Sequence, residues 1–306
     1  KVQTSDGNIY EAKSVVVAPG TFLRAKIFWG DYEIQAGRQG EINSIKLAVA
    51  LEKLGIKFGK LRTETPPRVD LRSVNFSGLN LQQYDHVPEM FSFEGQYDGR
   101  EQKNVYISYV ERNCIDYIKE NLNKSATCKS KFSSKSPRYC PSIEDKVKIF
   151  NEKQRHPVFI QPEGKDSSEM YLHGLFTTFP EEIQQGIINK IKGLENAVIT
   201  RPGYGVEYDF LEPFQLKSNL ESKKVPNIFF AGQINGTTGY EEAAAQGVVA
   251  GFNAAMKAKG KNTIFLSRED GYIGVMIDDI TSKSITQPYR MLTSRNEFRI
   301  FHRHDN

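Results

Sequence analysis

The chain has 306 residues, of which 39% are hydrophobic and 25% charged, so its composition is that of one large or two ordinary globular domains. The formal net charge is only +4, from 41 basic and 37 acidic residues, so a nucleic-acid surface would have to come from local clustering of basic side chains. No apolar run approaches the ~18 residues of a membrane span and no secretory signal is present, so we expect no membrane contact.

The first predicted elements are a hairpin and a buried strand. Residues 2–4 and 9–10 flank an Asp6-Gly7 turn, a pattern typical of a β-hairpin. Residues 14–18 form a short apolar run that ends in Pro19-Gly20-Thr21. This pattern favours a buried parallel strand whose carboxyl end meets a ligand, as is usual in open α/β sheets.

A helix and a segment of different character follow. Ser44 is placed to cap a helix that ends near Gly55 and whose apolar face holds Leu47, Ala48, Leu51 and Leu54. The run Thr65-Pro66-Pro67-Arg68 is expected to end regular structure. Further on, residues 105–109 alternate as in a strand, and residues 143–150 and 181–194 are predicted helices.

These changes of character divide the chain into four segments. We expect residues 1–73 to begin one domain, 74–200 to form an inserted domain, 201–260 to return to the first domain, and 261–306 to start a third region. The chain starts at Lys1 without a methionine and stops at Asn306 without a helix-stop signal. We therefore expect it to be a fragment of a longer protein.

Cysteine and histidine spacing limits the redox and metal chemistry. The three cysteines, Cys114, Cys128 and Cys140, are odd in number and have no C-x-x-C spacing. This argues against a disulfide framework and a zinc site, and it favours the reducing cytoplasm. No metal is predicted, because no ligand spacing links the histidines His86, His156 and His173.

The most informative stretch is residues 228–247. An apolar strand leads into a loop with Gly232, Gly236 and Gly239, and the loop opens an alanine-rich helix. Backbone N–H groups and the helix dipole at such a start can meet a phosphate or a flavin carbonyl, and glycines let the backbone approach a ligand closely. The alanines and Gly247 predict close packing on a sheet. Because the spacing is not G-x-G-x-x-G, an ordinary strand-to-helix connection stays open.

Five blocks of the sequence point to a known family. They are Gly20-Thr21-Phe22-Leu23; Gly37-Arg38 with Gly40 and Ser44; Thr65-Pro66-Pro67-Arg68; Pro-Arg-Tyr-Cys-Pro-Ser-Ile-Glu-Asp-Lys at 137–146; and residues 230–247. Residues 201–209 and 289–295 extend the match essentially from end to end. In this order, the blocks closely resemble the MnmG (GidA) family of flavoenzymes.

The resemblance implies an α/β fold with three parts. These are a Rossmann-like FAD-binding domain in residues 1–73 and 201–260, an inserted α+β NAD-binding domain in 74–200, and from 261 the start of a helical region that binds tRNA and a partner. The family's first nucleotide-binding unit and most of its helical region have no counterpart here. The fragment alone is therefore expected to bind FAD weakly and to be inactive.

The resemblance also implies a reaction. The family installs a carboxymethylaminomethyl or aminomethyl group at carbon 5 of the wobble uridine of tRNA. It uses FAD, NADH and methylene-tetrahydrofolate, and it works in the cytoplasm as a homodimer with the GTPase MnmE.

Cofactor residues follow from the same resemblance. FAD is expected where residues 15–21, Ser44 and the 230–240 loop converge at one sheet edge, with N–H groups near 237–240 facing the isoalloxazine or the pyrophosphate. The expected FAD-binding residues are Gly20, Thr21, Ser44, Gly232, Gln233, Asn235, Gly236, Thr237, Gly239 and Tyr240. The expected NAD-binding residues are Ser136, Pro137, Arg138, Tyr139, Ser142, Glu144 and Lys146.

Cys140 is the catalytic candidate. A thiolate that adds to carbon 6 of uracil would make carbon 5 nucleophilic. Arg138, Lys135 and Lys146 are close in sequence, and their charge would favour the thiolate. An associated acid–base role and a buried structural cysteine are the alternatives.

Three arginines are candidate tRNA contacts, because guanidinium groups suit phosphates: Arg290, Arg295 and Arg299. If residues 287–306 form a helix, Arg295 and Arg299 lie one turn apart on one face. An ordinary solvated helix, paired through Glu297 and Asp305, is the structural alternative.

Other functions remain open. A folate- and FAD-dependent tRNA uridine methyltransferase similar to TrmFO is a close alternative, although residues 137–146 favour MnmG. A disulfide reductase would need a redox cysteine pair, which the sequence lacks. A non-catalytic RNA-binding module would bind no flavin.

Overall fold

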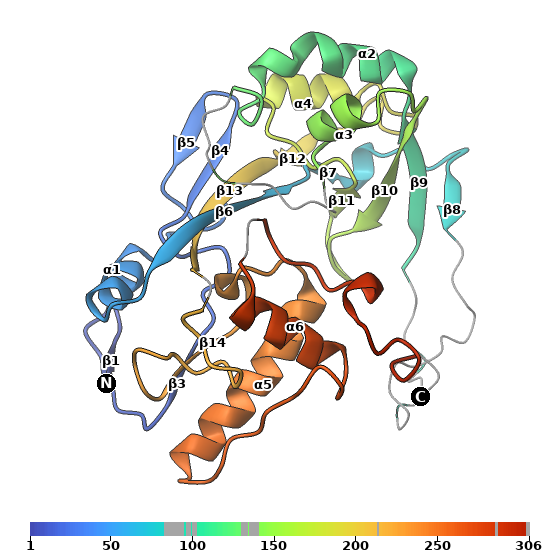
Figure 1. Cartoon of the computed structure of the whole chain (residues 1–306). Coiled ribbons are helices and arrows are strands. Elements are labelled where there is room, and N and C mark those ends of the chain that lie inside the picture. Colours follow the sequence, from blue (N-terminus) through green and yellow to red (C-terminus); the bar gives the residue numbers. More distant parts are fainter. Residues whose placement is uncertain are drawn as a thin grey trace.

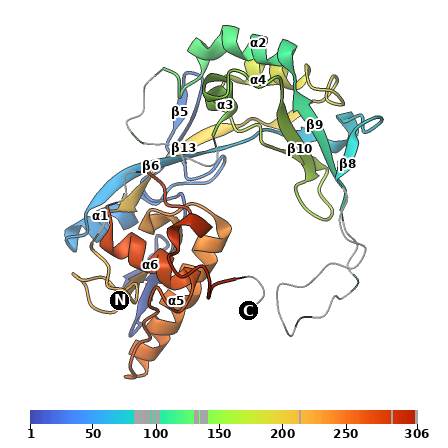
Figure 2. The same cartoon turned by 45° about the vertical axis from the view of Figure 1, so that its right-hand side comes forward.

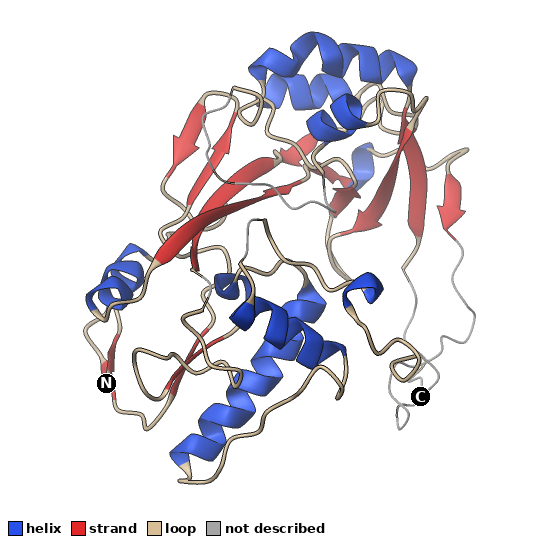
Figure 3. Cartoon of the chain, in the orientation of Figure 1, coloured by secondary structure: helices blue, strands red, loops and turns tan. Residues whose placement is uncertain are grey.

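The computed structural model describes residues 1–82, 95, 99, 103–129, 134, 141–212, 214–284 and 287–303. Helices and strands both occur along these residues, which confirms the mixed α/β class expected from the sequence (Figure 3). In the described part of the chain, no helix is both long and apolar enough to cross a membrane. The domain boundaries inferred from the sequence stay a prediction.

Two small sheets contain the beginning of the chain. Strands β1 (Val2–Gln3) and β2 (Ile9–Tyr10) pair antiparallel, which confirms the hairpin. Strand β3 (Val15–Val17) pairs in parallel with β14 (Ile228–Phe230), as expected. The expectation that β3 is buried was wrong for Val16, which is 39% exposed, because the described chain covers only one face of this two-stranded sheet.

A four-stranded antiparallel sheet follows the order β5 (Tyr32–Ile34), β4 (Lys26–Trp29), β13 (Tyr204–Leu211) and β6 (Phe58–Thr65). One face is apolar, with Ile27, Leu61, Val206 and Tyr208 buried. Side chains alternate along a strand, so the other face is charged, and there Lys60 Nζ lies 2.6 Å from the buried Asp209 carboxylate. Helix α1 (Ile45–Lys53) precedes β6.

Helix α1 begins after Ser44 as predicted, but the Ser44 hydroxyl makes no capping hydrogen bond. Ala48 and Leu51 are buried, while Leu54 is 48% exposed, so the predicted apolar face is correct except at its end. The Pro66-Pro67 pair interrupts the strand structure for only two residues, because β7 (Arg68–Asp70) begins directly after it. Strand β6 therefore ends at the proline pair as predicted, and β7 begins a different sheet.

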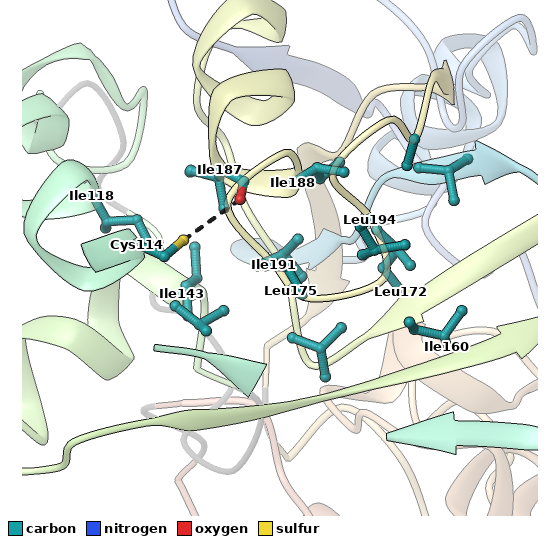
Figure 4. Packing of buried hydrophobic residues seen from close by; sticks show 14 of the residues in the cluster. Cys114, Ile118, Ile143, Ile160, Leu172, Leu175, Ile187, Ile188, Ile191 and Leu194 are labelled. Atoms are coloured by element: carbon teal, nitrogen blue, oxygen red, sulfur yellow. Dashed lines mark hydrogen bonds between the residues drawn. The ribbon is translucent and has the colours of Figure 1, made fainter. Parts of the chain in front are cut away.

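A six-stranded antiparallel sheet has the order β12 (Ile199–Arg201), β7, β11 (Glu169–His173), β10 (His156–Pro162), β9 (Val105–Val110) and β8 (Asn80–Gln82). Three helices, α2 (Arg112–Asn121), α3 (Ile143–Ile149) and α4 (Glu181–Ile188), bury their apolar sides on one face of it. Figure 4 shows this core, with Cys114 among isoleucines and leucines. Short 3-10 turns lie at η1 (Leu71–Ser73) and η2 (Leu122–Lys124).

The second predicted helix of this region is shorter than expected. It ends at Ile188 and not at 194. The reason is local: the Asn189 side-chain amide donates to the Glu195 carbonyl at 2.5 Å, and Gly193 has φ +83°. The chain thus closes a compact turn where the periodicity alone predicted more helix.

The remaining elements lie after β14. A 3-10 turn, η3 (Gly232–Asn235), leads to the long helix α5 (Tyr240–Ala258), and α6 (Tyr272–Ser282) and η4 (Thr293–Arg295) follow. Helix α5 packs on β14 and β3 through residues such as Val249 and Ala250. The expectation that Gly247 touches a sheet was wrong, because helical spacing places it on the outer face, where an added Cβ would meet nothing within 4 Å.

The views agree on the arrangement of these parts. Figures 1 and 2 show α2, α3 and α4 on the side of the six-stranded sheet that points away from α5 and α6. The long strands β6 and β13 run between these two parts of the molecule. The other face of the six-stranded sheet therefore lies on the same side as the helices that follow the glycine-rich loop.

Residues 287–303 do not form the helix that was considered for residues 287–306, since the only helical turn among them is η4. Arg268 instead holds this segment against α6: it donates to Asp278 at 2.9 Å, to Asp279 at 2.8 Å and to Glu297 at 2.6 Å. Asp279 is 3% exposed and also accepts from the Tyr289 hydroxyl at 2.8 Å. Glu297 is therefore not paired within a terminal helix. It belongs to a group of ion pairs, here called the clamp, in which Arg268 joins Glu297 to Asp278 and Asp279 of α6.

The clamp predicts a pH-dependent stability. Burial alone would raise the pKa of Asp279, but hydrogen bonds from Lys283, Arg268 and Tyr289 bring it below its ordinary value of 3.8. A carboxylate with a lowered folded pKa stabilises the fold above its unfolded pKa, and this contribution is lost as the pH falls through the folded value. Asp279→Asn should therefore lower the free energy of unfolding by roughly 1–2 kcal/mol at pH 7, measured by urea denaturation. The two proteins should begin to converge as the pH falls below about 3.8 and should become equal only below the lowered pKa of Asp279 in the folded protein. A difference independent of pH would contradict the charged clamp.

Candidate functional site

Three loops meet at the carboxyl edge of the β3–β14 pair. The Ala231 N–H donates to the Val17 carbonyl at 3.1 Å, so the parallel strands end side by side. The loop after β3 carries Gly20, and the Ser44 N–H donates to the Phe22 carbonyl of this loop at 2.8 Å. The loop after β14 begins at Gly232. The convergence expected from the sequence is therefore present, and in open α/β sheets this edge is where ligands bind.

Glycine conformation opens this edge. Gly236 has φ +81° and Gly239 φ +128°, values that favour glycine over every other residue. At Gly20, with φ +57°, an added Cβ would meet nothing within 4 Å, so space remains above the turn. The first N–H groups of α5 have no partner inside the helix, and the Tyr240 side chain is 92% exposed. Among the described residues, the N–H groups of Tyr240 and Glu241 make no hydrogen bond, so the turn offers backbone donors to a ligand beside the carboxylates of Glu241 and Glu242.

Several residues predicted to bind FAD have side-chain hydrogen bonds that hold the loop together. The Asn235 side-chain amide donates to the Phe230 carbonyl at 2.9 Å and to Gln246 Oε1 at 2.8 Å. The Gln246 amide in turn donates to Thr237 Oγ1 at 2.9 Å. Asn235 and Thr237 are both buried, so these side chains set the loop conformation. One acceptor is left over, because Asn235 Oδ1 is buried without a hydrogen-bond partner in the described structure.

Two other predicted contacts also have partners within the chain. Gln233 Nε2 donates to the Tyr208 hydroxyl at 3.4 Å, and burial raises the pKa of Tyr208 well above its ordinary value. Thr21 Oγ1 donates to the Gly37 carbonyl at 3.1 Å. Tyr208 lies on β13, so this hydrogen bond ties the glycine-rich loop to the four-stranded sheet.

The segment around Tyr289 makes backbone hydrogen bonds to the glycine-rich loop. The Tyr289 N–H donates to the Gly236 carbonyl at 2.8 Å, and the Thr238 N–H donates to the Tyr289 carbonyl at 2.9 Å. The expectation that N–H groups near 237–240 all face the cofactor was therefore wrong for Thr238. Glu242, on the first turn of α5, accepts from the Met291 N–H at 2.8 Å and buries a second oxygen without a hydrogen-bond donor among the described residues.

The arginines expected to contact tRNA lie in different settings. Arg290 turns inward, with Nη1 donating to the Thr238 carbonyl at 3.2 Å and Nε 3.7 Å from the Glu242 carboxylate. Arg295 stacks over the Tyr289 ring at 4.3 Å and donates to the Arg290 carbonyl. Arg299 is exposed. The prediction that Arg295 and Arg299 lie one turn apart on one helix face was wrong, because this stretch is not a helix.

Most of the block expected to hold NAD and the catalytic thiol lies outside the described residues: Ser136, Pro137, Arg138, Tyr139 and Cys140. The rest of the block starts α3. Ser142 caps the helix by accepting from the Asp145 N–H at 3.2 Å, and Lys146 Nζ donates to the Gly174 carbonyl at 2.6 Å. These contacts hold the segment that follows Cys140.

Glu144 is buried at the start of α3. Its Oε1 accepts from the Ser125 hydroxyl at 2.8 Å, the Thr177 hydroxyl at 3.0 Å and the Thr178 N–H at 2.9 Å. Burial removes the carboxylate from water and raises the pKa of Glu144 despite these hydrogen bonds. Its Oε2 makes no hydrogen bond within the described structure. Such a network fixes the helix start but leaves little room for direct cofactor contact.

The other thiols differ from one another. Cys114 is buried, its thiol donates to the Ile187 carbonyl at 3.5 Å, and burial raises its pKa to about 12. Cys128 is half-buried, with Sγ 2.9 Å from Lys148 Nζ. Within the described ranges, no group of three or more His, Cys, Asp or Glu side chains could hold a metal ion.

Comparison with known sequences gives a consistent result. The sequence model of the family described as glucose inhibited division protein A matches residues 1–262. A protein of Streptococcus suis (strain 05ZYH33), named tRNA uridine 5-carboxymethylaminomethyl modification enzyme MnmG, is 46% identical over 307 aligned residues that span 100% of this chain and 48% of the relative. A protein of the same name from Bacillus licheniformis is 47% identical over 305 aligned residues, spanning 100% of this chain and 49% of the relative.

Comparison with known structures agrees. Aquifex aeolicus GidA in its form I crystal has a TM-score of 0.91 and 45% identity, covering 99% of this chain and 52% of that one. Its form II crystal gives a TM-score of 0.89 and 44% identity, covering 99% and 49%. The chain thus spans about half the length of the relatives that it matches.

Proposed function

The chain belongs to the glucose inhibited division protein A (GidA) family, and on this premise we propose that it is the flavin-binding part of an enzyme that modifies uridine in tRNA at carbon 5. The observation that carries the proposal is the identity of 46% over the whole chain to an enzyme named for carboxymethylaminomethyl modification. The open glycine-rich turn at the carboxyl edge of β3 and β14 supports it.

FAD is the cofactor that we place at this turn. When bound, it would supply the redox chemistry of the reaction, with NADH as reductant. Gly20 and Gly239 would allow the backbone to approach the cofactor, and the N–H groups of Tyr240 and Glu241 would bind its phosphate or carbonyl oxygens. Asn235 Oδ1 is an acceptor available for a hydroxyl or ring N–H. The side-chain hydrogen bonds of Gln246 and the backbone hydrogen bonds of Tyr289 would hold these groups in the same positions in the absence of the ligand.

Cys140 is the residue that we assign to the uridine. Its thiolate would add to carbon 6 of the ring, and the carbon 5–carbon 6 π electrons would move so that carbon 5 forms a bond to the methylene carbon of methylene-tetrahydrofolate while one carbon–nitrogen bond to the folate breaks. The nitrogen of glycine or ammonium would then replace the remaining folate nitrogen on this carbon, and tetrahydrofolate would leave. Loss of the carbon 5 proton and release of the thiolate would restore the ring. Ser142 and Lys146, anchored on α3, would position this thiol.

The remaining assignments follow the family. We propose that residues 74–200 bind NADH, that the segment from 261 contributes to tRNA binding through Arg299, and that the protein acts in the cytoplasm as a homodimer with the GTPase MnmE. Arg290 and Arg295 would then shape the glycine-rich loop and would act on tRNA only through it.

Nucleoside analysis tests the proposal. A bacterium that lacks its own family member should regain 5-carboxymethylaminomethyl- or 5-aminomethyluridine in its tRNA, detected by mass spectrometry, when it expresses this protein at its natural length. Appearance of 5-methyluridine instead would indicate the folate-dependent methyltransferase. Unchanged tRNA, with the protein soluble and folded, would contradict both enzymatic functions.

A further inference from the structure

The six-stranded sheet has an open face that the function proposed so far does not use. Helices α2, α3 and α4 cover the face that holds Val158, Ile160 and Leu172. Because side chains alternate along a strand, the neighbouring residues point to the other side. That side carries four rings, which we call the ring platform: Tyr109, Phe159, Tyr171 and His173.

The rings of the platform contact one another at different angles. Phe159 and His173 are register partners with ring centroids 6.0 Å apart and planes tilted by 60°, and Tyr171 stacks on His173 with centroids 6.1 Å apart and an interplanar angle of 28°. His173 is exposed, and the other three rings are half-buried. The imidazole is only partly removed from water, and this desolvation together with the charge of Lys146 lowers the pKa of His173 below its ordinary value of 6.5, so the ring is mainly neutral at pH 7. Rings left partly open on a sheet offer π-faces to a planar ligand.

Guanidinium groups lie at both ends of the platform. Arg155 sits 4.2 Å above the Tyr109 ring and Arg68 4.8 Å above the Tyr171 ring. Arg68 also pairs with Glu163 at 3.3 Å, and Arg201 pairs with Glu169 at 2.9 Å, so this end is nearly neutral. Arg155 is exposed and makes no ion pair in the described part of the chain, so its charge is available to a phosphate.

The length and the place of the platform identify its ligand. From β9 to β11 its rings cross two strand spacings, about 10 Å, which is more than a single ring needs. The Ile143 N–H donates to the Phe176 carbonyl at 2.7 Å, and the Phe176 ring contacts His173 edge-on at 5.6 Å. The platform is therefore joined to the start of α3, directly after the segment that carries Cys140.

We propose that the ring platform binds unpaired bases of the tRNA substrate by stacking, next to the uridine that is modified. This inference rests on the proposed function. Sequence-specific RNA recognition favours splayed bases on aromatic side chains, and a cation at one end suits the connecting phosphates.

Fluorescence anisotropy with a labelled anticodon stem–loop RNA tests the platform in this chain. His173→Ala and Phe159→Leu should each weaken binding roughly tenfold. His173→Phe should bind as tightly as the wild type, because it keeps the ring. Tyr32→Ala is the matched control, since Tyr32 is 65% exposed on a different sheet and should have no effect.

The outcomes separate this inference from the proposed function. Equal RNA affinity of wild type and both ring-removing variants, or no RNA binding by the wild type, would overturn the platform even where the full protein modifies tRNA. A loss of NADH affinity without a loss of RNA affinity would overturn it in favour of the dinucleotide. Platform-dependent RNA binding in a protein that leaves uridine unmodified would keep the platform and overturn the proposed reaction.

Discussion

Alanine in place of Gly239 is expected to destabilise the chain by roughly 2–4 kcal/mol and to lower its flavin affinity at least tenfold. The backbone φ of +128° is a value that residues with a Cβ rarely adopt. An added Cβ would also lie 1.9 Å from Glu242 Oε2 and 2.8 Å from Arg290 Nη1. Glu242 cannot move freely, because it accepts the Met291 N–H. The turn, the start of α5 and the segment from Tyr289 to Met291 would shift together.

Gly247→Ala is the control for this substitution. Gly247 lies in α5, on a surface where an added Cβ meets nothing within 4 Å. Alanine there should stabilise the chain by about 0.5–1 kcal/mol through helix propensity and leave flavin binding unchanged. Urea denaturation and flavin titration measure both variants. Equal flavin affinity of Gly239→Ala and the wild type would show that the glycine-rich turn does not hold the cofactor.

Serine in place of Cys140 is expected to abolish tRNA modification while flavin absorbance and thermal stability stay nearly intact. A hydroxyl at this position is a far weaker nucleophile at neutral pH than a thiolate, so the addition to carbon 6 would fail. The measurement is the modified nucleoside content of tRNA after reaction with the protein at its natural length.

The two other cysteines provide controls. Cys114→Ser places a hydroxyl in the core shown in Figure 4 and should cost about 1–3 kcal/mol of stability without preventing the reaction. Cys128→Ser should change neither the stability of the protein nor the modification of tRNA. Wild-type modification by Cys140→Ser would remove the nucleophile hypothesis, and lost stability with retained turnover would assign Cys140 a structural role.

Local patterns predicted several of the elements. The hairpin, the parallel pair of β3 and β14, strand β9, helix α3 and the strand–loop–helix around Gly236 all have strong short-range signals. The errors arose where side-chain contacts, local or distant, decide the course of the backbone. Asn189 closes a turn that ends α4, and Arg268 holds residues 287–303 in an extended course where arginine spacing allowed a helix. Neither contact is visible as periodicity.

The candidate site was predictable in place but not in detail. Strand ends and glycines located the edge, yet sequence could not show that Asn235 and Thr237 point inward or that Tyr289 takes the Thr238 N–H. Gln246 was missed, although it lies four residues after Glu242, one helical turn away on the same face. The ring platform was missed because its rings come from three strands whose register no local pattern fixes.

The central claim is that the edge formed by β3, β14 and the start of α5 holds FAD in a tRNA-modifying enzyme. The visible absorption spectrum of the protein at its natural length, after removal of free flavin, tests it most directly. We expect bound FAD in about a one-to-one ratio to the chain, decreased in Gly239→Ala and retained in Gly247→Ala. A colourless protein that takes up no added FAD, while its folded structure is intact, would contradict the claim.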